Sequence, residues 1–249
     1  MDKQIIPAND IFIGRNIPAL KDDHIHIWSI DINESEHLLS FCKSALTEAQ
    51  INQSNFFEFD ESRKSYIVSQ GCLRLLLSYY LKRDAGQVNI GRHRKGKPFS
   101  EDDDTLFFNI SHSGEKCVLA FGRNQEVGID LEQLRQLSDL DELIEKNFNQ
   151  KEQKYINADA SARSLRFFQF WTMKESYLKA IGEGMRLTPD QIEFRIEREK
   201  IKLHMTNGIN DSEHWLFEKF EIDQDYIGTL SYLYEKTRIS YYHISTPIS

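Results

Sequence analysis

The order of helical and strand-type segments restricts this chain to a mixed architecture. Apolar residues repeat with a helical period in three stretches, at about residues 35–55, 60–82 and 139–181. Short alternating segments typical of strands follow them in two clusters, at 87–132 and from Pro189 onward, with one earlier strand at 24–30. Helices and strands thus come in separate runs, which predicts an α+β fold with a boundary near residues 122–126.

Length, charge and hydropathy exclude several classes of protein. The 249 residues suffice for one large domain or two modest ones, and 40% hydrophobic with 28% charged residues is typical of soluble globular proteins. A net charge of −8 argues against a nucleic-acid partner. No apolar run approaches the roughly 18–20 residues that a membrane span needs, and the N-terminus lacks a signal-type apolar stretch. We therefore expect a cytoplasmic protein with no membrane partner.

The cysteines give no sign of a metal site. Cys42, Cys72 and Cys117 are far apart and odd in number, and they fit no C-x-x-C pattern. We expect them to be small core residues of a protein in a reducing compartment.

Two acidic side chains share one face of a strand in the stretch VGIDLE (127–132). Apolar residues alternate there with Gly128, Asp130 and Glu132, the period of a strand with one apolar face. Like charges at neighbouring positions of a face repel each other. Either this face is simply solvated, or a positive group lies across it.

A third carboxylate occupies an unusual position in the helical stretch FWTMKESYLKAIGEG (170–184). At about 100° per residue, Glu175 falls inside an apolar stripe between Phe168 and Trp171, and Lys179 lies beside it one turn later. An i,i+4 surface pair, worth about 0.2–0.5 kcal/mol, is the ordinary interpretation. Alternatively, Glu175 joins Asp130 and Glu132 in an all-oxygen pocket, which suits Mg²⁺.

Two further segments are typical of phosphate binding. GRHRKGKPFS (91–100) carries four basic residues in an acidic chain, Arg92, Arg94, Lys95 and Lys97. FNISHSG (107–114) gathers small polar side chains, Asn109, Ser111, His112 and Ser113. Each has an ordinary alternative, because basic loops are often only solvated and clusters of short polar residues often cap turns through the backbone.

These motifs together resemble a known family. GKP, NISHS, GIDLE and WTMKESYLKAIGEG, in that order, are similar to the motifs of the Sfp-type 4′-phosphopantetheinyl transferases. The family pattern G-[IV]-D-[IL]-E followed by W-x-x-K-E-x-x-x-K is matched at every fixed position, by Gly128, Asp130, Glu132, Trp171, Lys174, Glu175 and Lys179. The upstream helix also fits D-x-x-R and L-L-R through Asp60, Arg63 and Arg74. The resemblance covers about residues 47–194.

The resemblance implies transfer of the phosphopantetheine arm of coenzyme A to a serine of an apo acyl or peptidyl carrier protein, with release of 3′,5′-ADP. It implies a monomer of two similar α/β halves, at residues 1–123 and 124–249, with the active site in the cleft between them. The Mg²⁺ ligands that it implies are Asp130, Glu132 and Glu175. The coenzyme-binding residues that it implies are Arg63, Lys97, Ser111, His112 and Lys174.

Two catalytic residues follow from the same resemblance. Lys179 would neutralise or protonate the departing 3′,5′-ADP, and Glu175 would take the serine proton directly or through water. One segment departs from the family, because TEAQINQSNFFEF (47–59) contains no Lys or Arg, and Ser65 stands where many relatives carry a second arginine. Either phosphate binding is weaker here, or Lys64 and the basic run at 92–95 substitute.

Two other classes of protein remain as alternatives. A metal-dependent nuclease also uses clustered carboxylates and a lysine, but its E-x-K typically lies on a strand, and the net charge disfavours DNA. The other alternative is a binding protein that kept the fold but lost catalysis, although every metal-ligand and lysine position of the family pattern is intact. The pathway is open among fatty-acid, polyketide and peptide synthases.

Overall fold

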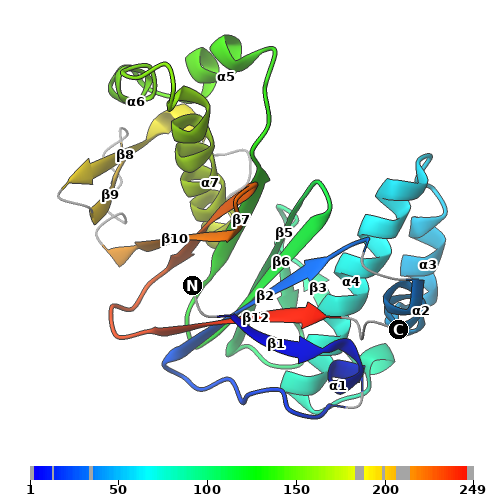
Figure 1. The fold of residues 1–249 in the computed structure, drawn as a ribbon. Helices are drawn as coiled ribbons and strands as arrows, with labels where there is room; N and C mark the ends of the chain where they lie inside the picture. Colours follow the sequence, from blue (N-terminus) through cyan, green and yellow to red (C-terminus); the bar gives the residue numbers. More distant parts are fainter. Residues whose placement is uncertain are drawn as a thin grey trace.

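The described residues form two main sheets, each covered by helices, and two separate two-stranded ribbons (Figure 1). The computed structural model describes residues 3–12, 14–33, 36–182, 188–197, 200–205 and 214–245. The elements of the first half are β2 (His24–Asp31), α2 (Glu36–Ala45), α3 (Glu48–Ser54), α4 (Asp60–Leu81), η1 (Ala85–Gln87), β3 (Ile90–Arg92), β4 (Pro98–Ser100), β5 (Leu106–Ser113) and β6 (Lys116–Arg123). Those of the second half are β7 (Gly128–Gln133), α5 (Leu140–Asn147), α6 (Gln150–Ile156), α7 (Arg163–Ile181), η3 (Pro189–Gln191), β8 (Ile192–Glu197), β9 (Lys200–Met205), β10 (Leu216–Asp223) and β11 (Tyr226–Tyr232).

The two halves repeat one topology. In each, a first strand leads through helices to one long helix, then to a two-stranded ribbon, and then to two strands that return to the first. The sheet orders β2-β6-β5 and β7-β11-β10 are equivalent, and every pair within them is antiparallel. The prediction of an α+β fold built from two similar halves is confirmed.

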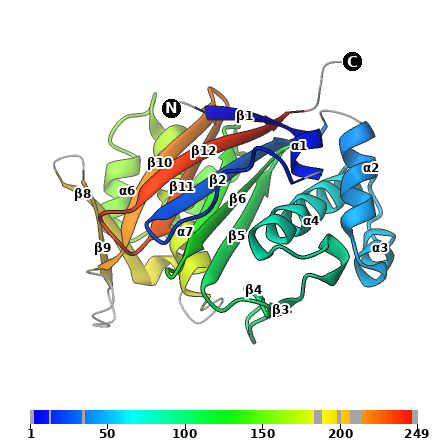
Figure 2. The ribbon, with the colours of Figure 1, turned by 90° about the horizontal axis from the view of Figure 1, so that it is seen from below.

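The sheet of the first half also contains the first and the last of the described strands in the sequence, β1 (Lys3–Pro7) and β12 (Arg238–Ser245). Strand β12 pairs in parallel with β2, and β1 pairs in parallel with β12, followed by the short helix α1 (Ala8–Phe12). Figure 2 shows these strands side by side along one edge of the sheet. Residues 238–245 were predicted to belong to the second half, but they complete the first.

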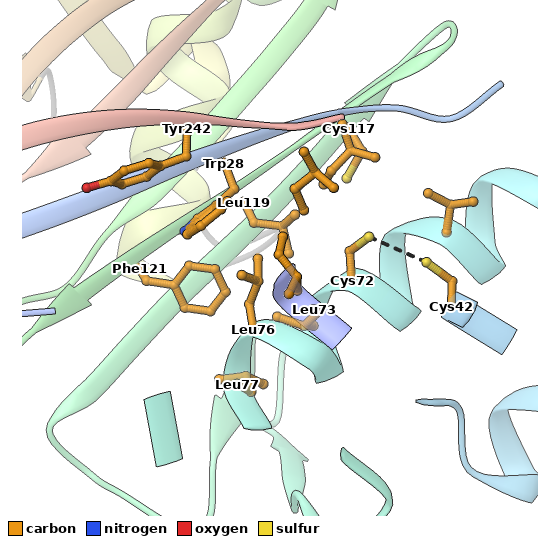
Figure 3. Close-up of a cluster of buried hydrophobic side chains, with 14 of the residues drawn as sticks. Trp28, Cys42, Cys72, Leu73, Leu76, Leu77, Cys117, Leu119, Phe121 and Tyr242 are labelled. Carbon is orange, nitrogen blue, oxygen red and sulfur yellow. Dashed lines mark hydrogen bonds between the residues drawn. The ribbon is translucent and has the colours of Figure 1, made fainter. Parts of the chain in front are cut away.

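Helix α4 supplies the core of the first half. Its buried face carries Leu73, Leu76 and Leu77 against Trp28 and Phe121 of the sheet (Figure 3). Each such side chain contributes about 1.5–3 kcal/mol by leaving water.

The cysteines lie in this core, as predicted. Cys42, Cys72 and Cys117 are free and buried, and the sulfurs of Cys42 and Cys72 are 3.5 Å apart where α2 meets α4 (Figure 3). In the described part of the chain, no helix is long and apolar enough to cross a membrane.

Several predicted boundaries shift for local reasons. The helical stretch at 35–55 divides at Thr47, which caps α3 through its side chain. The stretch at 139–181 forms three helices, and a capping box of Asn149 and Glu152 begins α6. The strand cluster predicted from residue 87 begins only at Ile90, and β5 runs on through the polar cluster to Ser113.

Candidate active site

Gly128 allows α7 to lie unusually close to β7. A Cβ atom at this position would lie 2.0 Å from the Ser176 carbonyl oxygen and 2.5 Å from the Ala180 amide nitrogen. Since both are backbone atoms of α7, the helix could not accommodate it without moving. The glycine of the GIDLE motif therefore sets the distance between the strand that carries Asp130 and the helix that carries Glu175.

We expect Gly128→Ala to destabilise the protein by about 1–3 kcal/mol, the usual cost of overpacking a close contact. Urea unfolding followed by tryptophan fluorescence would measure the loss. Gly86→Ala is the matched control, because a Cβ there meets no atom within 4 Å. Equal stability of the two variants would show that α7 and β7 are not in tight contact.

Strands β5 and β7 are joined by side chains in place of a backbone ladder. The two strands belong to different sheets, yet Asn109, Ser111 and Ser113 of β5 point at the edge of β7. Their oxygens accept the backbone N–H groups of Ile129, Leu131 and Gln133, at 3.0, 3.3 and 3.1 Å. We call these three contacts the side-chain ladder. The polar cluster of FNISHSG thus joins the two halves and caps no turn.

The three predicted carboxylates meet at one cavity of about 830 Å³ beside this ladder. Its walls include Asp130 and Glu132 from β7 and Glu175 from α7. The same cavity is lined by Ser111, His112 and Lys179. Residues from both halves therefore surround a single space, as the resemblance predicted for the active-site cleft.

Lys179 is paired with Asp130, not with Glu175 on its own helix. Its ammonium group donates to Asp130 Oδ1 at 2.6 Å and to Ser111 Oγ at 2.8 Å. The Lys179 side chain is 29% exposed, whereas that of Asp130 is 6% exposed. The ordinary interpretation of residues 175 and 179 as an i,i+4 surface pair is therefore wrong.

Burial raises the pKa values of all three carboxyl groups, and repulsion between carboxylates adds to it at Glu132 and Glu175. Burial is the main cause at Asp130, where the Lys179 charge opposes it. At Glu132 and Glu175, burial is again the main cause, and the negative charge of Asp130 raises their pKa values further. Such a site gains stability when a positive charge is added between the carboxylates.

One oxygen of the Asp130 carboxylate is left without a partner. Asp130 Oδ2 is buried and has no hydrogen-bond partner in the described structure. Among the described residues, no group of three or more acidic, histidine or cysteine side chains is arranged to hold a metal ion. Mg²⁺ does not require such a group, because it usually takes one or two carboxylates together with substrate phosphates. The donor set of Asp130, Glu132 and Glu175 therefore suits Mg²⁺ bound with a phosphorylated substrate.

Comparison with known proteins decides the family. The model of the 4′-phosphopantetheinyl transferase superfamily matches residues 126–231, and that of the 4′-phosphopantetheinyl transferase N-terminal region matches residues 31–124. The 4′-phosphopantetheinyl transferase HetI of Nostoc sp. is 34% identical over 172 residues, which cover 67% of this chain and 72% of HetI. The chain belongs to the 4′-phosphopantetheinyl transferase family.

Other relatives carry the same activity in their names. The 4′-phosphopantetheinyl transferase Sfp of Bacillus subtilis is 27% identical, over 67% of this chain and 71% of Sfp. The L-aminoadipate-semialdehyde dehydrogenase-phosphopantetheinyl transferase of Xenopus laevis is 28% identical, over 78% of this chain and 70% of its own. The protein is therefore an enzyme that transfers phosphopantetheine to carrier proteins.

Two of the predicted coenzyme residues of this phosphopantetheinyl transferase, Ser111 and His112, line the cavity of the carboxylates. His112 lines the same cavity, and burial together with the Lys179 charge lowers the pKa of its imidazole, which favours the neutral ring. Arg63 does not line the cavity. It donates to Asp60 at 2.6 Å and to the Phe57 carbonyl at 3.0 Å, while its Nε is buried without a partner.

Lys97 of the transferase lies at a second cavity, of about 650 Å³. This space lies on the other side of Glu175 and Lys179 and is also lined by Lys95, Pro98 and Leu178. The Lys97 ammonium donates to Glu126 and to the Ala180 carbonyl oxygen. Lys97 thus links the β3–β4 ribbon to the end of α7 while its side chain borders the cavity.

Lys174 lies away from both cavities of the transferase. Its side chain is fully buried, and its ammonium donates to Glu152 at 2.7 Å and to the carbonyl oxygens of Pro189 and Ile192. Glu152 also accepts the N–H groups of Asn149 and Phe194. Lys174 thus joins α7 to α6 and to the segment that leads into β8.

The sequence analysis did not predict one wall of the cavity that the three carboxylates line. It is formed by the first turns of α4, through Ser62, Ser65, Tyr66 and Ser69, with Trp171 of α7 nearby. The spacing of these α4 residues places them on one helix face, so a polar stripe was visible in the sequence. Residues 183–187 of the GEGMRL segment lie outside the described structure.

Proposed function

We propose that this enzyme transfers 4′-phosphopantetheine from coenzyme A to a serine of an apo acyl or peptidyl carrier protein, in a Mg²⁺-dependent reaction that releases 3′,5′-ADP. The observation that supports it most is the meeting of three carboxylates and Lys179 at one cavity of a family member. The serine oxygen forms a new bond to the phosphorus that bears the pantetheine arm. The bond from that phosphorus to the bridging oxygen breaks, and 3′,5′-ADP leaves with that oxygen.

The carboxylates would hold the cation. Asp130 offers its unpartnered Oδ2, and Glu132 and Glu175 flank it at the cavity wall. When bound, Mg²⁺ would neutralise negative charge on the pyrophosphate, which is the main demand of phosphoryl transfer. Without it, the three buried carboxylates repel both one another and the coenzyme.

Glu175 would accept the proton of the attacking serine. No hydrogen bond to its carboxylate is found among the described residues, and its pKa is raised by burial and by Asp130. A raised pKa makes a carboxylate a better base near neutral pH. Its half-buried position at the cavity allows it to reach the hydroxyl directly or through one water.

Lys179 would stabilise the leaving group. Its ammonium lies between Asp130 and Ser111, on the wall shared by the two cavities. From there it can donate to the bridging oxygen as negative charge develops on 3′,5′-ADP. This is a contact that strengthens in the transition state and so acts on kcat.

The second cavity suits the nucleotide end of the coenzyme. Its lining combines apolar surfaces of Pro98, Ile110 and Leu178 with the ammonium groups of Lys95 and Lys97. Apolar walls fit an adenine ring, and ammonium groups fit a 3′-phosphate. Lys95 then supplies part of the positive charge that residues 47–59 lack.

Mass spectrometry of the carrier tests this proposal. The full-length protein is incubated with coenzyme A, Mg²⁺ and an apo carrier protein, with fatty-acid and peptide-synthase carriers run in parallel. We expect a gain of one phosphopantetheine per carrier and loss of the reaction when EDTA is added. No mass gain on any carrier would favour a binding protein that kept the fold, and nicked DNA in place of modified carrier would favour a nuclease.

A further inference from the structure

The hydroxyl group of Ser113, at the end of the side-chain ladder, makes two hydrogen bonds. Its Oγ accepts the N–H of Gln133 at 3.1 Å and donates to Glu132 Oε2 at 2.9 Å. Ser111 repeats this arrangement one step earlier, since its Oγ accepts the N–H of Leu131 and donates to Asp130 at 3.0 Å. Each serine of one half therefore holds a carboxylate of the other half.

The backbone amide makes this contact directional. A serine hydroxyl has a single hydrogen, and an N–H that points at its oxygen occupies a lone pair. The Gln133 N–H donates to a lone pair of the Ser113 oxygen, so the Ser113 hydroxyl hydrogen is free to be donated to Glu132. The carboxylate is thereby held in one orientation on a strand edge where it could otherwise rotate into solvent.

The surrounding turn fixes the position of Ser113 itself. Gly114 follows it with a φ of 53°, in the left-handed region that favours glycine. A Cβ there would lie 2.4 Å from Gln133 Oε1 and 2.6 Å from the Tyr226 hydroxyl. The same hydroxyl accepts the N–H of Glu115 at 3.1 Å. The β5–β6 turn therefore rests directly on the second sheet.

We propose that Ser113 is a positioning residue for the metal site, holding Glu132 for the cation from across the boundary between the two halves. The inference rests on the proposed function, because it takes Glu132 as a metal ligand. Arg135 also pairs with this carboxylate, but its Nη1 atom lies 3.5 Å from Glu132 Oε2 and its side chain is half exposed, so it cannot replace the short contact of Ser113.

Manganese binding to the full-length protein tests the inference without any catalytic step. Mn²⁺ is titrated into wild type, Ser113→Ala and Asn109→Ala without coenzyme A, and free Mn²⁺ is measured by electron paramagnetic resonance. Partners that orient metal ligands typically contribute 10–100-fold to affinity. We expect Ser113→Ala to raise the Mn²⁺ dissociation constant by about 10-fold or more, and Ser113→Thr, which keeps the hydroxyl, to restore most of it.

Asn109→Ala is the matched control. It removes a ladder contact of the same kind, to the N–H of Ile129, but no carboxylate contact of Asn109 is found in the described structure. Its dissociation constant should stay within about twofold of wild type. Thermal unfolding with EDTA present should show similar shifts for the two alanine variants.

A double-mutant cycle locates the effect on Glu132. In a Glu132→Gln background, Ser113→Ala should add no further loss of Mn²⁺ affinity. An undiminished effect in that background, or equal losses in Ser113→Ala and Asn109→Ala, would overturn the inference, as would wild-type affinity in Ser113→Ala. Failure of wild type to bind Mn²⁺ with or without coenzyme A would instead refute the metal site of the proposed function.

Discussion

Asp130→Asn is expected to abolish carrier modification while leaving the protein at least as stable as wild type. The substitution keeps the shape of the side chain but removes the charge that would bind the cation and pair with Lys179. Loss of a metal ligand should exceed the roughly 10–100-fold effect of residues that only orient ligands. Initial rates of carrier modification at saturating coenzyme A and Mg²⁺ would measure it.

Stability is expected to rise because this carboxylate is costly to bury. Its folded pKa is raised by burial, so the ionised form destabilises the native state; the cost begins near the unfolded pKa of about 4, grows as pH rises to the folded pKa and is constant above it. The negative charge also raises the pKa values of Glu132 and Glu175. Melting temperatures of Asp130→Asn and wild type, compared at pH 7 in EDTA, would show the difference.

Asp104→Asn is the control for charge removal alone, since Asp104 is exposed and lies outside both cavities. It should keep wild-type activity and stability. Near wild-type turnover by Asp130→Asn would refute the assignment of this carboxylate to the metal.

Lys174→Met is expected to lower the free energy of unfolding by about 3–5 kcal/mol, the usual cost of removing one partner of a buried ion pair. The substitution leaves Glu152 buried without its cation and leaves two carbonyl oxygens without a donor. Burial already raises the pKa of Glu152, so the carboxyl group is expected to take up a proton in the variant. Urea unfolding at pH 7 would measure the loss.

Lys179→Met provides the matched comparison on the same helix. Its side chain is partly exposed, so the loss of stability should be small, while kcat should fall sharply with little change in the KM for coenzyme A. The two lysines of W-x-x-K-E-x-x-x-K should thus separate into one for stability and one for catalysis. If Lys174→Met were as stable as wild type but had a raised KM for coenzyme A, the result would support a role of Lys174 in coenzyme binding instead of stability.

The face that each carboxylate occupies could be predicted because it depends on periodicity, whereas their meeting at one cavity was implied only by the family resemblance. Alternation places Asp130 and Glu132 on one strand face, and the helical period places Glu175 among apolar residues rather than toward solvent. The capping box at Asn149 is likewise a local signal, since both partners lie within one turn. Such features follow from residues close together in the chain.

The partners of individual lysines could not be predicted, because they lie far away in the sequence. The pattern around Lys174 does not contain Glu152, and that around Lys97 does not contain Glu126. Motif likeness assigns both lysines to the coenzyme, whereas in the structure each forms an ion pair with a residue from a distant element. The side-chain ladder had a signal that was overlooked, because Asn109, Ser111 and Ser113 alternate with the strand period.

The insertion of β12 between β1 and β2 has a consequence for synthesis of the protein. Antiparallel β5 and β6 can form a hairpin as soon as they leave the ribosome, and β6 can then pair with β2. The opposite edge of β2 has to wait for residues 238–245, which are translated after the entire second half. Such distant pairing gives a high contact order and slow folding. Until then, an unpaired edge of the nascent chain is open to other strands, so chaperone protection matters most before the final strand emerges.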